Sequence, residues 1–162
     1  MAKGCRLDWK STNSVEISGE IDEYADFSGL SRSMGQILYV DFARVTRLNS
    51  SGLKLWLQSI TKNKIQLVLR ECSVAVVEQF FMIPQFMGKN GVVESFYASY
   101  SCVSCEHEEQ MRYQIGQNID LRSPQIGSEL KDPCPECGAS MELDQSQDMY
   151  LSFFQTHSPA AS

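Results

Sequence analysis

Two Cys-x-x-Cys pairs in the last third of the chain restrict its fold more than any other feature. CVSC (102–105) and CPEC (134–137) each place two thiols on one tight turn, so both can bind a single ion. The first ten residues lack the apolar stretch of a secretory signal, so we expect a cytoplasmic protein whose paired cysteines bind metal rather than form disulfides. The predicted metal ligands are Cys102, Cys105, Cys134 and Cys137.

The segment 101–145 resembles a zinc ribbon, in which two such turns hold one structural zinc ion. Pro135 and Gly138 give the second turn the composition of a zinc knuckle. The 28 residues between the pairs (106–133) exceed the roughly 15–20 of the compact pattern, so we expect a β-hairpin or a long loop there. A piece of about 45 residues is too small for an independent hydrophobic core, and a closed four-sulfur shell would stabilise it.

Three other uses of these residues stay open. Similar turns hold iron in rubredoxin-like sites, although that family usually has glycine where this chain has Glu106, and its aromatic signature is missing here. The cysteines could instead be redox-active or form disulfides, and His107 could replace one sulfur ligand. Because four thiols complete a tetrahedral shell, we predict one structural zinc ion, with iron as the alternative.

Residues 1–100 alternate between strand and helix patterns, beginning with a hairpin. The apolar run Ile37–Val40 fits a strand covered on both faces, and Pro84 ends the last helix. Because parallel strands need crossover connections, this order predicts an α/β fold with a mixed β-sheet and helices packed on it. The metal module follows at 101–145, and a tail at 146–162. The predicted strands are 5–9, 14–21, 36–42, 65–72 and 91–101, and the predicted helical segments are 22–35, 53–60 and 73–83.

The stretch RLNSSGLKLW (47–56) lies where the third of these strands gives way to a helix. Leu53, Trp56 and Ile60 have the spacing of one helix face, and Asn49 belongs to the residue types preferred as helix N-caps. The two serines behind Asn49 can cap the helix or carry a modification. The local pattern alone leaves both uses open.

In this context residues 1–100 resemble a STAS domain, the fold of anti-sigma factor antagonists and of the cytoplasmic tails of sulfate transporters. GEID (19–22), ILYVDFARVTRLNSSGL (37–53) and IQLVLRECSVAVVEQFFMI (65–83) carry the resemblance. It implies that a partner anti-sigma kinase phosphorylates Ser50, with Ser51 as the second candidate. Antagonists have Asp before this serine where this chain has Asn49, which leaves the switch itself open. The implied partner-binding residues are Asn49, Ser50, Ser51, Gly52 and Leu53.

The resemblance implies a non-catalytic signalling protein that works by partner switching: the unmodified form binds its partner and the phosphorylated form releases it. A constitutive adaptor docked on a transporter or membrane complex is the first alternative, and Asn49 favours it. A zinc-ribbon contact to the transcription machinery is the second.

Several function classes lack support in the sequence. No glycine-rich phosphate loop or paired carboxylate motif indicates an enzyme. The net charge of −6 argues against binding to nucleic acid, and no apolar run reaches the roughly 20 residues that span a membrane.

The stretch VVEQFFMIPQFM (76–87) contains more apolar side chains than one helix face can hold. We expect the metal module to cover them, with an external protein partner as the alternative. The residues concerned are Phe80, Phe81, Met82, Ile83, Phe86 and Met87.

Overall fold

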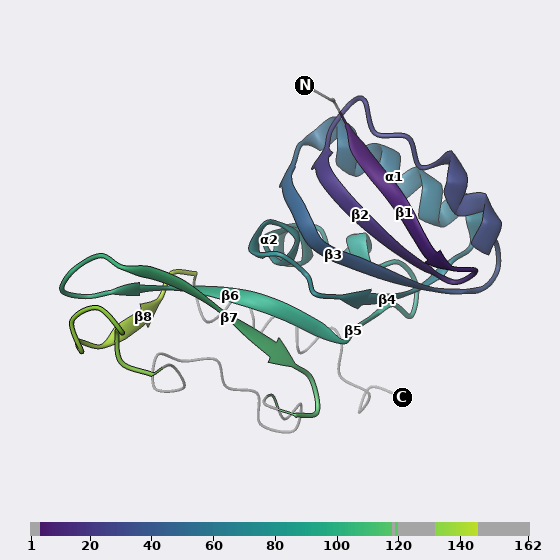
Figure 1. Cartoon of the computed structure of the whole chain (residues 1–162). Coiled ribbons are helices and arrows are strands. Elements are labelled where there is room, and N and C mark those ends of the chain that lie inside the picture. Colours follow the sequence, from purple (N-terminus) through teal and green to yellow (C-terminus); the bar gives the residue numbers. More distant parts are fainter. Residues whose placement is uncertain (1–3, 118, 120–131, 146–162) are drawn as a thin grey trace.

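The structure of the protein is a computed structural model that describes residues 4–117, 119 and 132–145. The fold is mixed α/β and contains two sheets, a five-stranded mixed sheet and a three-stranded antiparallel sheet (Figure 1). The tail predicted at 146–162 lies outside the described residues, as do residues 118 and 120–131 of the long segment between the two cysteine turns.

The first sheet has the strand order β1-β2-β3-β4-β5. β1 and β2 form the predicted antiparallel hairpin, while β2 to β5 run parallel, with helical segments between consecutive strands. The mixed sheet predicted from the sequence is thereby confirmed. The strands are β1 Cys5–Ser11, β2 Ser14–Ile21, β3 Ile37–Leu48, β4 Gln66–Arg70 and β5 Val92–Val93.

The helical segments lie in the crossovers between the parallel strands. α1 begins after its N-cap Asn49 and ends at Lys64, which adopts the left-handed conformation that terminates many helices (φ 52°). α2 ends before Pro84 as predicted, because a proline disfavours helical geometry in the residue before it. The helical segments are η1 Ser28–Ser33, α1 Ser50–Asn63, α2 Val74–Met82 and η2 Pro84–Met87.

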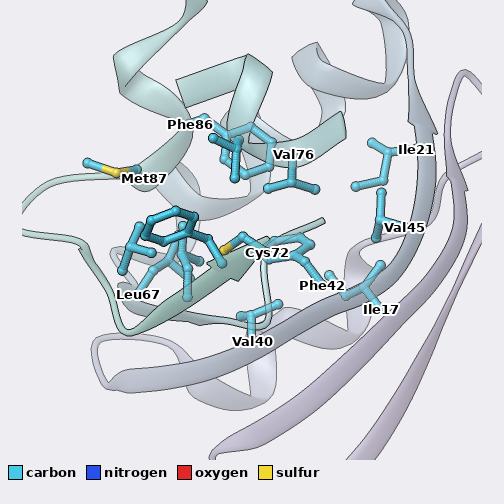
Figure 2. Close-up of a cluster of buried hydrophobic side chains, with 14 of the residues drawn as sticks. Ile17, Ile21, Val40, Phe42, Val45, Leu67, Cys72, Val76, Phe86 and Met87 are labelled. Atoms are coloured by element: carbon cyan, nitrogen blue, oxygen red, sulfur yellow. The ribbon is translucent and has the colours of Figure 1, made fainter. Parts of the chain in front are cut away.

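Trp56 of α1 lies at the centre of the core between the first sheet and the helices. Its ring packs edge-on against Phe27 and Phe42 at centroid distances of 5.3 and 5.6 Å, and stacks on Phe86 at 5.4 Å. Its Nε1–H donates to the carbonyl oxygen of Phe86 at 2.9 Å, so the polar atom of the ring is paired. Figure 2 shows how apolar side chains of β2 and β3 face those of α2 and η2 across this core.

β3 differs from the predicted strand in burial and in length. Leu38 is fully buried, but Ile37 is 46% exposed, and the Arg70 guanidinium lies 4.2 Å above the ring of half-buried Tyr39. The expectation that this strand is covered on both faces was therefore wrong, because the described helices pack on alternate residues of one face. The strand also continues to Leu48, since it pairs with β2 along the whole length of β2.

The apolar stretch 76–87 is divided between core and surface. Phe86 is fully buried, whereas Met82 is 70% exposed. The expectation that the metal module covers this stretch was wrong for Phe86, because η2 turns the chain back over Trp56 in the core of the first sheet. The side chains of Phe80 and Phe81 lie outside the described part of the structure.

The second sheet begins within the β segment predicted at 91–101. β5 pairs with β4, but β6 leaves the first sheet and becomes the central strand of the order β7-β6-β8, antiparallel to both neighbours. The segment predicted as one strand at 91–101 is therefore divided between the two sheets. β6 pairs with β7 from Ser95 to Ser101, whereas β4 is too short to pair with β6 over that length. The strands are β6 Ser95–Cys102, β7 Glu108–Gln114 and β8 Met141–Leu143.

The residues between β4 and α2 connect the two sheets. The backbone N–H of Cys72 donates to the carbonyl oxygen of Ser95 at 3.1 Å, and the N–H of Tyr97 donates to that of Cys72 at 2.9 Å. Glu71 donates its backbone N–H to the Ser95 hydroxyl at 2.8 Å. The start of β6 is thus fixed to the end of β4.

Candidate metal centre

The four predicted cysteine ligands meet at one point. Their sulfur atoms all lie within 4.8 Å of one another. The Sγ atoms of Cys102 and Cys137 are 3.4 Å apart, and those of Cys105 and Cys134 are 3.6 Å apart. A disulfide would need about 2.05 Å, whereas four sulfurs bound to zinc at about 2.3 Å stand about 3.8 Å apart. The group is therefore spaced for a shared metal ion and contains no disulfide.

Strand pairing brings the two turns together. Cys102 is the last residue of β6, and its partner in the β6–β8 ladder is Met141. The N–H of Val103 donates to the Ser140 carbonyl oxygen at 3.1 Å, which joins the first turn to the segment behind the second. Neighbouring antiparallel strands thus place cysteines that are far apart in the sequence around one centre.

The two turns share a backbone design. The N–H of Cys102 donates to the His107 carbonyl oxygen, and the N–H of Cys134 donates to that of Ala139, both at 2.8 Å. The residue after the second cysteine has a positive φ in each turn: 64° at Glu106 and 79° at Gly138. Glycine adopts this conformation without strain, whereas glutamate adopts it at a cost. Glu106 therefore occupies a glycine-type position in an otherwise ordinary knuckle.

Backbone N–H groups stabilise negative charge on the buried sulfurs. The N–H groups of Cys105 and Ser104 point at the Sγ of Cys102 from 3.5 and 3.4 Å and lower the pKa of that thiol to about 6. The N–H of Glu136 approaches the Cys134 Sγ in the same way at 3.4 Å. Metal ligands are thiolates, so these contacts prepare the site for a cation.

The metal-free cluster cannot ionise completely. The N–H of His107 lowers the pKa of Cys105, but burial and hydrogen bonds with the other sulfurs raise it to about 12. Hydrogen bonds among the sulfurs lower the pKa of Cys102 and raise that of Cys105, as expected where neighbouring thiols share protons that a divalent cation would displace. The imidazole Nε2 of His107 lies 3.1 Å from Glu109 Oε1 instead. The described cluster is thus an all-sulfur donor set that fits zinc or iron.

The segment predicted to bind a partner forms the first turn of α1, on the first sheet. The Asn49 side chain accepts the N–H of Gly52 at 2.8 Å through Oδ1 and donates through Nδ2 to Glu23 Oε2, also at 2.8 Å. Its backbone N–H donates to the Ile21 carbonyl oxygen at 3.0 Å. Asn49 is therefore an N-cap held between the end of β2 and the segment behind it.

The five implied partner-binding residues differ in their exposure. Ser50 and Ser51 are exposed on the first turn of α1. Gly52 and Leu53 are buried, and a Cβ at Gly52 would overlap the carbonyl group of Ile21. Gly52 brings the start of the helix close to the end of β2 and Leu53 is part of the core, while both serines are exposed.

A charged network beside the sheet junction was not predicted. The Arg112 guanidinium of β7 binds the Glu71 carboxylate, which also accepts the Tyr97 hydroxyl at 3.0 Å. Arg112 and, second to it, Tyr97 lower the pKa of Glu71 against the effect of burial. Glu71 has a positive φ of 50°, uncommon outside glycine. No spacing in the sequence marks these three residues, because they come from separate elements.

Comparison of the chain with protein-family models, with curated proteins and with solved structures found no match. Among the described residues, no helix is both long enough and apolar enough to cross a membrane. The two features of the molecule that bear on its function are the cysteine cluster and the exposed first turn of α1.

Proposed function

We propose that the protein is a non-catalytic, cytoplasmic, STAS-like regulator that binds a signalling protein through the first turn of α1 and is controlled by phosphorylation of Ser50. The observation that carries this proposal is the placement of Ser50. Its exposed side chain is at the first position of a helix whose entry is fixed by Asn49 and Gly52. An N-terminal hairpin followed by parallel strands, with helices in the crossovers, supports the STAS-like assignment.

A phosphate at Ser50 would alter binding without unfolding the domain. It would add about −1.5 to −2 charges to a surface that must lose water when a partner binds. The N-terminus of α1 carries a partial positive charge and would stabilise the phosphate within the same molecule. The core behind the turn, with Leu53 and Trp56 buried, is not touched by this change. The partner is thus released while the fold persists.

In this proposal the four cysteines hold one structural zinc ion. A closed four-sulfur shell leaves no open position for water or substrate, so the ion stabilises the second sheet and takes part in no reaction. The ion would hold the two cysteine turns together beside the three-residue strand β8, in a module too small for a large core of its own. Iron is the alternative ion for the same donor set.

A constitutive adaptor is the second candidate, and the Asn49–Glu23 hydrogen bond favours it. A carboxylate at position 49 could not donate to Glu23 and would repel it, so this turn is built around a neutral amide. A kinase that requires an acidic residue before the serine would not modify Ser50. The same exposed turn would then dock permanently on its partner, for instance on a membrane complex.

A pull-down from native cell extract tests both candidates. The tagged full-length protein is compared with Ser50→Ala, Ser50→Asp and the matched control Gln58→Asp, which adds the same charge at an exposed position of α1 outside its first turn. We expect Ser50→Ala to retain a partner that Ser50→Asp loses, and phosphatase treatment of the extract to increase recovery. Recovery of one partner by all variants, regardless of phosphatase, supports the adaptor; an intact mass without phosphate would agree with it.

A further inference from the structure

A cavity of about 560 Å³ lies at the opposite end of α1 from Ser50. The end of α1, the starts of β3 and β4 and the segment behind η2 enclose it. Its volume falls within the roughly 300–1,000 Å³ of sites that take small molecules. Neither candidate site described above contributes a residue to it.

The lining of the cavity contains both apolar and basic residues. Ile60 and Ile65 are buried, and Ile37 continues this apolar surface outward with 46% of its area exposed. Lys64 and Lys89 also line the cavity, whereas none of its described lining residues is acidic. In a chain of net charge −6, two lysines without a neighbouring carboxylate in the lining form a locally positive surface.

The cavity is held open by hydrogen-bonded turns. The N–H of Gly35 donates to the Asn63 carbonyl oxygen at 2.8 Å, and the side-chain amide of Gln66 donates to that of Asn90 at 3.3 Å. Lys64 and Gly88 each turn the chain with a positive φ, of 52° and 71°. A site whose backbone is fixed in this way loses little entropy when a ligand binds.

Three of the last four carbonyl groups of α1, those of Ile60, Thr61 and Asn63, accept hydrogen bonds from residues beyond the helix. The N–H groups of Lys64 and Ile65 both donate to the Ile60 carbonyl oxygen, and Lys64 also donates to that of Thr61. With these carbonyl groups paired, the two ammonium groups are the strongest charges that the cavity presents to a ligand. Its electrostatic preference is therefore for an anion.

We propose that this cavity binds a small amphipathic anion, in which a carboxylate or sulfonate meets Lys64 and Lys89 and a short apolar body lies against Ile37, Ile60 and Ile65. The inference is independent of the proposed function and would stand if Ser50 were never phosphorylated. Gln66 and Asn90 are further polar residues of the lining, and the side chain of Gln66 is already bonded to the backbone of Asn90. A ligand with only a charged group, or with only an apolar chain, should bind more weakly because it contacts only part of the lining.

Displacement of 8-anilinonaphthalene-1-sulfonate, itself an amphipathic anion, tests this proposal on the full-length protein. We expect saturable one-to-one fluorescence and displacement by octanoate, while octan-1-ol and acetate compete about tenfold or more weakly. Lys64→Asn combined with Lys89→Gln should weaken octanoate binding about tenfold and leave octanol unchanged. Asparagine is chosen at position 64 because it tolerates the left-handed backbone.

Two controls locate the binding and exclude a folding effect. Lys54→Gln removes an exposed lysine of α1 that does not line the cavity and should leave octanoate binding unchanged. In amide NMR spectra, octanoate should shift the signals of Gly35 and Gly88, and all variants should keep the thermal midpoint of the wild type. Equal binding of octanol and octanoate, unchanged binding in the double variant, or shifts confined to other residues would overturn the proposal.

Discussion

Glu71 and Arg112 connect the two sheets through a bidentate ion pair. The guanidinium Nε lies 2.8 Å from both carboxylate oxygens, and Nη2 lies 2.5 Å from Oε1. Glu71 follows β4 of the first sheet, and Arg112 belongs to β7 of the second. The Tyr97 hydroxyl of β6 binds the same carboxylate at 3.0 Å. The Glu71 side chain thus contacts both β6 and β7 of the second sheet.

Replacing Arg112 should weaken the attachment of the second sheet. Arg112→Gln removes the charge and the fork of donors, and we expect a loss of about 1 kcal/mol in the free energy of unfolding, limited because 42% of the side chain is exposed. Urea unfolding of the wild type and the variant measures this loss in free energy. Arg44→Gln is the matched control: its guanidinium lies 3.9 Å from Glu16 and the side chain is 75% exposed, so stability should not change. An equal loss in both variants would contradict the special role of Arg112.

The same pair should make stability depend on pH in a defined direction. Arg112 lowers the pKa of Glu71 below its ordinary value of 4.5, so the ionised carboxylate stabilises the folded state. This stabilisation is fully present above that ordinary value, which the unfolded chain should show, and is lost as pH falls through the lower folded pKa. Glu71→Gln should therefore be less stable than the wild type at pH 7, and urea unfolding should show the difference shrinking towards pH 3. If the difference in unfolding free energy between the two proteins stayed constant across this range, ionisation of Glu71 would not be its cause.

The metal centre should contain one zinc ion per chain. Metal analysis should find close to one equivalent of zinc, and a value under about 0.5 would count against a structural site. Cys102→Ser should lose the ion, whereas Cys5→Ser, which changes a cysteine outside the cluster, should keep it. Because protons compete with zinc for thiolates, acid should release the metal, and amide exchange should then rise in β8 while β2 and β3 stay protected.

The strained backbone at Glu106 predicts a stabilising substitution. Glu106→Gly should raise the thermal midpoint of the metal-bound protein, by about 1 kcal/mol in unfolding free energy, because glycine adopts a φ of 64° without steric cost. Gly138→Ala places a side chain at the equivalent position of the other turn, with φ 79°, and should have the opposite sign. Thermal unfolding of both variants checks the pair. A lower midpoint for Glu106→Gly would show that its side chain matters more than its backbone.

The contact between Asn49 and Glu23 can be tested by a double-mutant cycle. Asn49→Asp keeps an acceptor for the Gly52 N–H but places two carboxylates together, so we expect lower stability at pH 7. Adding Glu23→Gln should restore much of the loss, and the coupling energy from urea unfolding measures the interaction. Additive effects of the two substitutions would mean that the residues do not interact in solution.

The order of elements in the first sheet and the cluster of four cysteines could be predicted from the sequence. Alternating apolar patterns place the strands and helices of residues 1–83 with only their ends displaced, because these patterns arise from local geometry. The two Cys-x-x-Cys pairs predict that their four sulfur atoms lie close together, since each turn can present two sulfurs to one ion. The burial of Trp56 likewise follows from the spacing of the α1 face.

The division of the chain between the two sheets could not be predicted from local patterns. Ile37 looked like a core residue but is exposed, because burial depends on which face the helices cover. The transfer of β6 to the second sheet required β7 and β8 as partners, and the Glu71–Arg112 pair joins residues 41 positions apart. The cavity beside Lys64 and Lys89 likewise forms where three separate segments converge. A local pattern fixes which way a side chain points, but its neighbours come from distant parts of the chain, and packing alone selects them.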